Sequence, residues 1–406
     1  MLRLLTENTL DREEKIMAEW VERKISDIGT VVGGATPSTK KPENYEGGKI
    51  AWITPKDLST FSGRYIERGE RNITEIGLKS CSTQLLPPNT VLFSSRAPIG
   101  YVAITANEVC TNQGFKSVIP NENTDPLFLF YLLKYNKDKI EGMGSGTTFK
   151  EVSGNTMKNI VVNVPTDKKV QEKIAAILGS IDDKIEENEQ INNNLEQQAM
   201  ALYENTFCTP SNIAMKHISL SDLMDYSGGS QPPASKFIFI KRDGYIRFVQ
   251  IRDYDTDSHI TYIPESAKNK LCEEHDIMIA RYGASLGRIC FGINGAYNVA
   301  LAKVFPKKSY FREFLRCYLS SRTFYEGINN KGGRSAQAGF NQSDINSFEL
   351  DFPIDEAIVQ KFENTVAPMF EQRLQLRKEN QRLASLRDTL LPKLMSGELD
   401  VSDIDL

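Results

Sequence analysis

Residues 171–207 read QEKIAAILGSIDDKIEENEQINNNLEQQAMALYENTF, and this stretch decides how the rest of the chain is organised. No proline occurs between Pro165 and Pro210, so nothing in the stretch forbids one long helix. Every seventh residue belongs to a mainly apolar set, Ile174, Ile181, Asn188, Leu195 and Leu202. This spacing predicts a helix of about 60 Å with a coiled-coil seam on one face.

A second stretch near the end of the chain has the same seven-residue spacing, at Phe362, Met369, Leu376, Leu383 and Leu390. Pro368 lies near its start, at the place that Gly179 occupies in the first stretch. Both residue types weaken helices, so we predict a kink or a short preceding helix there. Asn188 and Asn380 each fall in a seam among apolar neighbours. A buried amide at such a position fixes the register of pairing, and the alternative is local fraying.

The segments that precede the two helices match each other in order. The turn GGATPS at 33–38 corresponds to GGSQPPAS at 228–235. The strand pattern IAWITPKDL at 50–58 corresponds to IRFVQIRDY at 246–254. Further matches follow, and the offset stays between about 186 and 196 throughout. A nearly constant offset over many segments indicates an internal duplication.

The predicted fold class is α+β, with two pseudo-symmetric globular α/β domains separated by two long helices that form an antiparallel coiled coil. The helices must run antiparallel if the globular halves are to lie at their opposite ends. The predicted boundaries are a first domain at 1–165 that includes a short helix at 1–19, a central helical region at 166–209, a second domain at 210–353 and a C-terminal helical region at 354–406.

Charge is distributed unevenly along the chain, whose formal net charge is −4. Residues 20–165 hold 17 basic and 14 acidic side chains, a net charge of +3. Residues 210–353 hold 18 and 15, again +3, whereas the central stretch 166–209 holds 4 and 9, which is −5. Mildly basic domains suit a nucleic-acid partner, although such an excess is weak evidence by itself.

The cysteines and the first residues indicate the compartment. Six scattered cysteines without a C-x-x-C pair are typical of reduced thiols. The start, MLRLLTENTLDREEK, contains acids and no long apolar run, which does not fit a signal peptide. No segment is apolar over a membrane-spanning length. We therefore expect a cytoplasmic protein without a membrane partner.

Catalytic motifs are missing from the sequence. It contains neither the phosphate-binding G-x-x-x-x-G-K-[ST] nor the dinucleotide-binding G-x-G-x-x-G. Its three histidines show no metal-ligand spacing and no nucleophile motif. The acids Asp182 and Asp183 fall on a heptad surface and are more typical of a solvated helix face than of a nuclease site. We predict no catalytic residue, no metal and no cofactor on this chain.

Polar side chains that suit DNA binding occur in both halves, mostly after predicted strands or on long polar loops. Arg96 follows the strand pattern at 90–95, and Arg281 holds the matching place in the second half. Each arginine either donates to guanine or phosphate or is an incidental surface residue. The amides of Asn112, Gln113 and Asn298 read adenine edges or cap turns. The candidate DNA-binding residues are Lys56, Ser94, Ser95, Arg96, Asn112, Gln113, Lys116, Thr147, Thr148, Lys150, Arg252, Arg281, Tyr282, Ser285, Arg288, Asn298, Lys303, Arg334, Gln337 and Gln342.

From Trp20 to Leu399 the chain resembles the specificity subunit of type I restriction–modification systems. The helical segments carry most of the resemblance: VPTDKKVQEKIAAILGSIDDKIEENEQINNNLEQQAMALYENTF, which begins at Val164, and LRDTLLPKLMSGEL, which begins at Leu386. Three segments are similar to the core of a recognition domain, namely WITPKDL from Trp52, FSSRAPIGYVAI from Phe93 and NQG from Asn112.

This resemblance implies two target recognition domains that each read one half of a split site on double-stranded DNA. It also implies that the two helical regions dock two methyltransferase subunits, with restriction subunits joining outside. The partner subunits would bind S-adenosylmethionine, ATP and Mg²⁺, and this chain would have no active site of its own.

Two other classes of function stay open on the sequence alone. One is an enzyme with a fused nuclease or methyltransferase, which the absence of N-P-P-[YF] and of a phosphate loop disfavours. The other is a structural coiled-coil adaptor. Charge reversal at Arg96 and Arg281 separates the adaptor from a DNA reader, because only a reader loses DNA binding while it keeps assembly.

Overall fold

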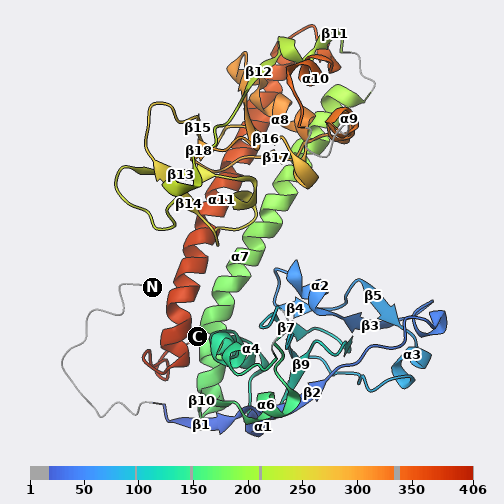
Figure 1. Ribbon diagram of the computed structural model, residues 1–406, viewed down its shortest axis with the longest axis vertical. Helices are drawn as coiled ribbons and strands as arrows, with labels where there is room; N and C mark the ends of the chain where they lie inside the picture. Colours follow the sequence, from blue (N-terminus) through green and yellow to red (C-terminus); the bar gives the residue numbers. More distant parts are fainter. Residues whose placement is uncertain (1–17, 97, 147–149, 210–212, 333–338, 406) are drawn as a thin grey trace. The chain divides into compact units, whose positions relative to one another are not determined.

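The structure is a computed structural model that describes residues 18–96, 98–146, 150–209, 213–332 and 339–405. The chain divides into two compact units (Figure 1), unit 1 with residues 1–187 and 380–406 and unit 2 with residues 188–379. The predicted helix at 1–19 lies outside the described residues except for its last two positions.

Unit 1 is built from three sheets and several short helices around the first part of α7 and the end of α11. Its strands are β1 (Trp20–Lys24), β2 (Gly29–Gly33), β3 (Ile50–Ile53), β4 (Tyr65–Ile66), β5 (Arg71–Ile73), β6 (Val91–Phe93), β7 (Val102–Thr105), β8 (Cys110–Thr111), β9 (Lys116–Pro120) and β10 (Val161–Pro165). Its helices are α1 (Ile25–Ile28), α2 (Pro55–Ser59), α3 (Glu75–Lys79), α4 (Pro126–Tyr135), α5 (Lys137–Gly142), α6 (Gly154–Asn159) and parts of α7 (Lys168–Tyr203) and α11 (Ala357–Met395).

Unit 2 repeats this plan around the end of α7 and the start of α11. Its strands are β11 (Met215–Ser219), β12 (Met224–Gly228), β13 (Tyr245–Val249), β14 (Thr261–Pro264), β15 (Leu271–Cys272), β16 (Met278–Ala280), β17 (Ile289–Cys290), β18 (Gly295–Tyr297), β19 (Leu301–Pro306) and β20 (Glu349–Pro353). Its other helices are α8 (Arg312–Ser320), α9 (Arg322–Gly332) and α10 (Gln342–Asn346).

The strand pairing of the two units matches sheet by sheet. The ribbon β1–β10 corresponds to β11–β20, and the sheet β2–β9–β6–β7–β4 corresponds to β12–β19–β16–β17. The small sheet β5–β3–β8 corresponds to β14–β13–β18–β15, and both contain one parallel pair. The fold class predicted from the sequence, two α/β domains with long antiparallel helices, is confirmed, and so is the duplication that underlies it.

A glycine in each copy lets a loop approach a strand end closely. A β-carbon on Gly34 would lie 2.2 Å from the carbonyl oxygens of Thr111 and Asn112. A β-carbon on Gly229 would lie 2.1 Å from the carbonyl oxygen of Asn298. Only glycine avoids this overlap, which explains why the matched turns GGATPS and GGSQPPAS both have glycine at their second position.

The strand predicted at 50–58 is shorter in the structure. β3 ends at Ile53, and α2 begins at Pro55 because the Asp57 carboxylate accepts a hydrogen bond from the Thr54 backbone N–H at 2.7 Å. In the second copy, Asp253 accepts from the Gln250 backbone N–H at 2.9 Å in the same way. A carboxylate cap of this kind starts a helical turn directly after the extended strand. The apolar pattern of the sequence does not reveal such a cap.

Both long helices are continuous, and they run antiparallel. In unit 1 the start of α7 packs with the end of α11 through Ile174, Leu178 and Leu394. In unit 2 the end of α7 packs with the start of α11 through Tyr203 and Phe362 (Figure 1). The apolar seam in the sequence therefore faces the partner helix and the domain cores, as its spacing predicts.

The prediction of a short separate helix before Gly179 and Pro368 is wrong, because α7 and α11 each run through that position as one helix. The alternative, a kink at this position, stays a prediction. Pro368 lies on the exposed side of α11, so water can satisfy the carbonyl whose backbone partner it removes. Gly179 lies in a closely packed place, since a β-carbon on it would lie 3.1 Å from the Leu127 side chain, and its carbonyl accepts a hydrogen bond from Arg64 at 3.3 Å.

A buried carboxylate joins three helices of unit 1. Asp182 on α7 accepts hydrogen bonds from the Tyr131 hydroxyl of α4 at 2.6 Å and from Arg387 of α11 at 2.8 Å. Burial, and then the neighbouring carboxylate, raise the pKa of Tyr131, which keeps its hydroxyl protonated as a donor. The sequence pattern suggests a solvated face at Asp182, and the structure instead places it in the core.

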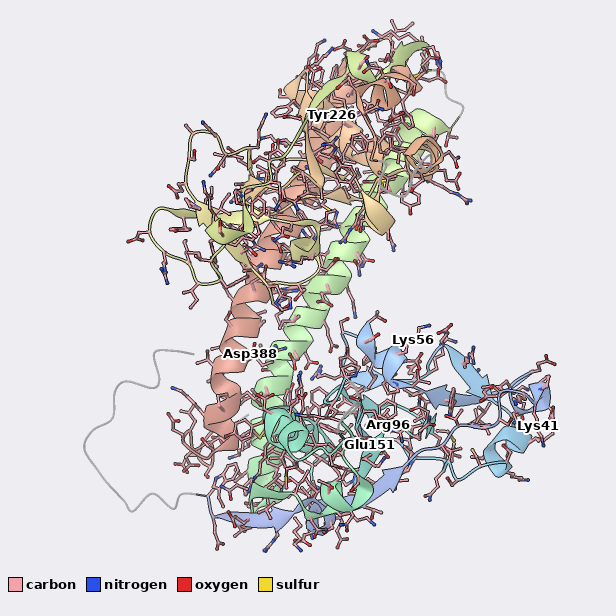
Figure 2. The ribbon with its side chains drawn as sticks, viewed as in Figure 1. Lys41, Lys56, Arg96, Glu151, Tyr226 and Asp388 are labelled. Atoms are coloured by element: carbon pink, nitrogen blue, oxygen red, sulfur yellow. The ribbon has the colours of Figure 1, made fainter. Side chains whose placement is uncertain are left out.

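Replacement of Asp182 by alanine is expected to lower the free energy of unfolding by about 3 kcal/mol, because it leaves Arg387 without its buried partner. Asp388 provides the matched control. It contacts the same guanidinium at 2.8 Å, but its side chain is 64% exposed, against 8% for Asp182. Asp388→Ala (Figure 2 labels Asp388) is expected to change stability by less than about 1 kcal/mol. Equal losses in chemical denaturation of the two variants would contradict this account.

Candidate nucleic-acid interface

The small sheets of the two units carry exposed cations. In unit 1 this part, called small lobe 1, consists of β5–β3–β8 and α3, and Lys41 marks its far end in Figure 2. In unit 2 the corresponding small lobe 2 consists of β14–β13–β18–β15 and its loops. The exposed cations that form no ion pair with any described residue are Lys40, Lys41, Lys49, Arg71 and Lys79 in small lobe 1 and Lys236, Lys241, Arg242, Lys268 and Lys270 in small lobe 2.

Reasoning from the sequence missed these cations. The signal that could have found them is a pair of adjacent basic residues in the two matched loops, Lys40–Lys41 and Lys241–Arg242. Because an unpaired exposed cation keeps its full charge for an anionic partner, these side chains suit contacts with phosphates.

Several predicted residues of unit 1 gather where β6 ends. The backbone of Arg96 pairs with that of Glu151, and the Arg96 Nε lies 3.1 Å from the Glu151 carboxylate (Figure 2). Lys116 lies 3.5 Å from the same carboxylate. Gln113 and Lys150 are exposed next to this group along the chain. We call these five residues strand-end cluster 1.

The charges in strand-end cluster 1 are coupled. Partial burial acts to raise the pKa of Glu151, but Arg96 and Lys116 outweigh it and hold that pKa below its ordinary value. The Arg96 side chain is still 46% exposed, so its outer edge is open to an incoming acceptor. Three cations, Arg96, Lys116 and Lys150, against one carboxylate leave the cluster with a positive charge.

The corresponding cluster of unit 2 uses aromatic rings in place of the carboxylate. The Arg281 guanidinium lies over the rings of Tyr282 and Phe340, 5.2 and 5.7 Å from their centroids, and donates to the Phe340 carbonyl at 3.4 Å. A β-carbon on Gly228 would lie 2.5 Å from Arg281 Nη1, so the side chain is packed closely. Arg281 thus supports the loop before α10, and Tyr282 and Ser285 beside it are half-buried. We call Arg281, Tyr282, Ser285 and Phe340 strand-end cluster 2.

Four predicted DNA-binding residues are used inside the protein. Ser94 and Ser95 are fully buried, and their hydroxyls donate to the carbonyls of Pro98 and Gly114. The amide oxygens of Asn112 and Asn298 accept hydrogen bonds from the backbone N–H two residues further on, at 2.8 and 3.2 Å. The turn-capping alternative holds for both amides. Burial leaves Ser94 and Ser95 no exposed hydroxyl for DNA, which corrects the prediction for these two residues. For Asn112 and Asn298 the amide oxygens are used in turns.

The remaining described candidates are spread over each unit. Three are tied to carboxylates: Lys56 lies 2.8 Å from Glu70, Arg288 donates to Asp255 at 3.0 and 2.6 Å, and Lys303 lies 2.6 Å from Asp276. Lys56 is highly exposed and Lys303 is mostly covered. Arg252 and Gln342 are exposed. Thr147, Thr148, Arg334 and Gln337 lie outside the described residues.

The described part of the chain contains no group of three or more His, Cys, Asp or Glu side chains arranged to hold a metal ion. Across the described ranges, we find no helix whose length and apolar character would let it cross a bilayer.

Comparison with known proteins identifies the family. A family model described as type I restriction modification DNA specificity domain matches residues 17–197 and again residues 212–374. The chain is 35% identical to the type I restriction enzyme MjaIX specificity subunit of Methanocaldococcus jannaschii, over 96% of both proteins. It is 24% identical to the HindI specificity subunit of Haemophilus influenzae, over 94% of this chain and 100% of that one.

A solved structure supports the fold. The type I restriction-modification S subunit from M. genitalium superposes with a TM-score of 0.60 at 16% identity, over 95% of this chain and 98% of that one. Two copies of a DNA specificity domain, joined by long helices, define a class of DNA target recognition subunits. The chain belongs to the specificity subunits of type I restriction–modification systems, which recognise the DNA target and are not catalytic.

The two strand-end arginines are expected to respond differently to truncation. Arg96→Ala should weaken binding of target DNA by the assembled restriction–modification complex about tenfold, because an exposed donor is lost. Arg281→Ala should lower the free energy of unfolding by about 1–2 kcal/mol, because two ring contacts are lost. DNA titrations and thermal unfolding measure the two effects.

Arg322→Ala is the control, since Arg322 is highly exposed on α9 and pairs only locally with Glu326 at 2.6 Å. It should change neither quantity. The distinction between the two clusters is refuted if Arg96→Ala destabilises the chain as much as Arg281→Ala while DNA affinity stays unchanged.

Proposed function

We propose that this chain reads a split site on double-stranded DNA, with one half read by the domain at 1–165 and the other by the domain at 210–353. The observation that carries the proposal is the twofold occurrence of one strand-pairing scheme, each with cations on its small lobe. Two similar readers in one chain suit two half-sites, as the two subunits of a symmetric dimer do.

In this proposal the contacts divide into two kinds. The unpaired cations of the small lobes contact phosphates, which supplies affinity and alignment but carries little sequence information. Polar side chains that are exposed or half-buried supply base contacts in the grooves. For this role we propose Lys56, Arg96, Gln113, Lys150, Arg252, Tyr282, Ser285, Arg288 and Gln342.

We propose that the helical regions at 166–209 and 354–406 dock two methyltransferase subunits, and that restriction subunits join outside them. The relatives are by name subunits of type I restriction enzymes, so partner chains are expected. The stretch 166–209 holds 9 acidic against 4 basic side chains, and an acidic surface repels DNA but suits a basic protein partner. S-adenosylmethionine, ATP and Mg²⁺ belong to the partners in this scheme.

The two asparagines of the helix seams, Asn188 and Asn380, are part of the same proposal. Asn188 is fully buried and donates to Glu379 at 3.1 Å, while Asn380 donates to the Ile185 carbonyl at 3.3 Å. An amide with a defined partner at a buried seam position penalises every shifted pairing of the helices. We propose that these contacts fix the register of α7 against α11.

Removal of one heptad from each helix tests whether the helices set the distance between the half-sites. Residues 187–193 of α7 and 378–384 of α11 contain both amides, and their joint deletion shortens each helix by about 10 Å. The unread spacer should then lose about three base pairs, or recognition should fail. Methylation mapping in a host that carries the altered chain measures the spacer.

Deletion from only one helix is the control, because it shifts the register and should unfold the pair. A double deletion that methylates the original site, with the original spacer, would show that the helices do not determine the distance.

A further inference from the structure

Two adjacent apolar side chains project from small lobe 2. Phe239 is 73% exposed and Ile240 is 75% exposed, more than any other large hydrophobic residue in the described part of the chain. Figure 1 shows that the loops around β13 and β14 project from the body of unit 2. Single exposed apolar residues are common, but two neighbours this exposed at a loop tip indicate a surface that meets another molecule.

The backbone on both sides holds this tip in place. Ile238 and Tyr262 exchange backbone hydrogen bonds of 3.0 and 2.8 Å, and the Phe237 ring packs on Phe248 at 5.3 Å. After the tip, the Tyr245 N–H donates to the Arg242 carbonyl at 3.2 Å. The pair is therefore presented by an anchored loop and needs little further ordering before it contacts a partner.

The tip does not pack back onto its own domain. A hollow of about 360 Å³ lies between Phe239 and Lys241 on one side and His259 and Tyr262 on the other. The neighbouring segment therefore leaves the apolar surface of the pair uncovered.

The charges around the pair identify the partner. Residues 236–242 read KFIFIKR, so three cations flank the apolar tip, and Asp243 is the first acid after them. None of these cations forms an ion pair within the described chain, and the nearby Asp257 is engaged by Arg247 at 2.7 Å. Lysine is depleted at the centres of protein–protein contacts, whereas an apolar wedge flanked by cations suits a duplex with stacked bases inside and phosphates outside.

The corresponding loop of unit 1 lacks this feature. Ile246 of β13 matches Ile50 of β3, which aligns the tip with Glu43 and Asn44. Asn44 is fully buried, and its side-chain N–H donates to the Ser38 carbonyl at 2.9 Å. An apolar tip is therefore a property of the second domain and not a consequence of the shared fold.

We propose that Phe239 and Ile240 form a wedge that enters the DNA between neighbouring base pairs in the half-site read by the second domain, with Lys236, Lys241 and Arg242 on the flanking phosphates. The inference rests on the proposed DNA-reading function of that domain. Unstacking costs least at flexible pyrimidine–purine steps. The wedge therefore makes binding of the second half-site depend on the base-pair step that it enters, although no side chain forms hydrogen bonds with the bases of that step.

The test uses the complex with methyltransferase subunits and target duplexes that carry 2-aminopurine at successive positions of each half-site. The wild-type complex should raise the fluorescence at one step of the second half-site, because the probe brightens when it is unstacked. The double variant Phe239→Ser/Ile240→Ser should lose this signal and bind the target at least about tenfold more weakly, with unchanged affinity for unrelated duplex.

The matched control is Phe305→Ser/Tyr325→Ser, which removes two exposed aromatic side chains of unit 2 that lie outside the small lobe. It should leave both readouts unchanged. Phe239→Trp supplies a second measurement that does not depend on loss of function, since it keeps the wedge and its indole emission should be quenched on target DNA.

Three outcomes overturn the wedge. The first is a Phe239→Ser/Ile240→Ser complex with wild-type affinity and fluorescence, and the second is an indole whose emission does not respond to DNA. The third is loss of the methyltransferase subunits from the double variant, which would make the tip a protein-docking surface. If the wild-type complex does not prefer target over unrelated duplex, the proposed function itself fails, and that result is distinct from all three.

Discussion

Each recognition domain depends on one buried joint, in which a short buried helix packs between its sheet and the two long helices. In unit 1 this helix is α4, and the joint is the Asp182 carboxylate held by Tyr131 and Arg387. In unit 2 it is α8, where Phe314 and Phe362 pack edge-on against Phe207 at 5.0 and 5.1 Å. One joint is polar and the other aromatic, yet both fix a domain to α7 and α11. Loops that contact DNA need such a rigid base, because a mobile base would raise the entropy cost of every contact.

The strand ends of the two units also share one backbone arrangement but differ in the side chains that contact the arginine. Arg96 meets a carboxylate, and Arg281 at the matching place meets two rings. The loop tips differ as well, buried and polar at Asn44 but exposed and apolar at Phe239. The duplicated strand pairing keeps the geometry constant while these side chains diverge. Two domains of this kind suit two half-sites of different sequence.

The sequence predicted the parts of the structure that local patterns encode. Heptad spacing revealed both helices, and a steady offset revealed the duplication, because these regularities depend only on neighbours along the chain. It failed where distant segments decide the outcome. Ser94 and Ser95 look like exposed strand-end hydroxyls until β9 and the loop after Arg96 cover them. Gly179 suggests that a short separate helix precedes it, but α7 is continuous there. The Gly179 carbonyl accepts a hydrogen bond from Arg64, which lies more than a hundred residues earlier in the chain. The sequence also could not show that the cations of the small lobes are unpaired, since pairing with carboxylates is a property of the fold.

The central claim, that each domain reads its own half of a split site, is tested most directly by methylation mapping of two chains. One is the natural chain, and in the other residues 210–353 are replaced by a second copy of residues 20–165. The natural chain should give a motif with two different halves around an unread spacer, and the altered chain a motif in which the first half occurs twice in inverted orientation. An uninterrupted motif from the natural chain, or an unchanged motif from the altered one, would contradict the claim.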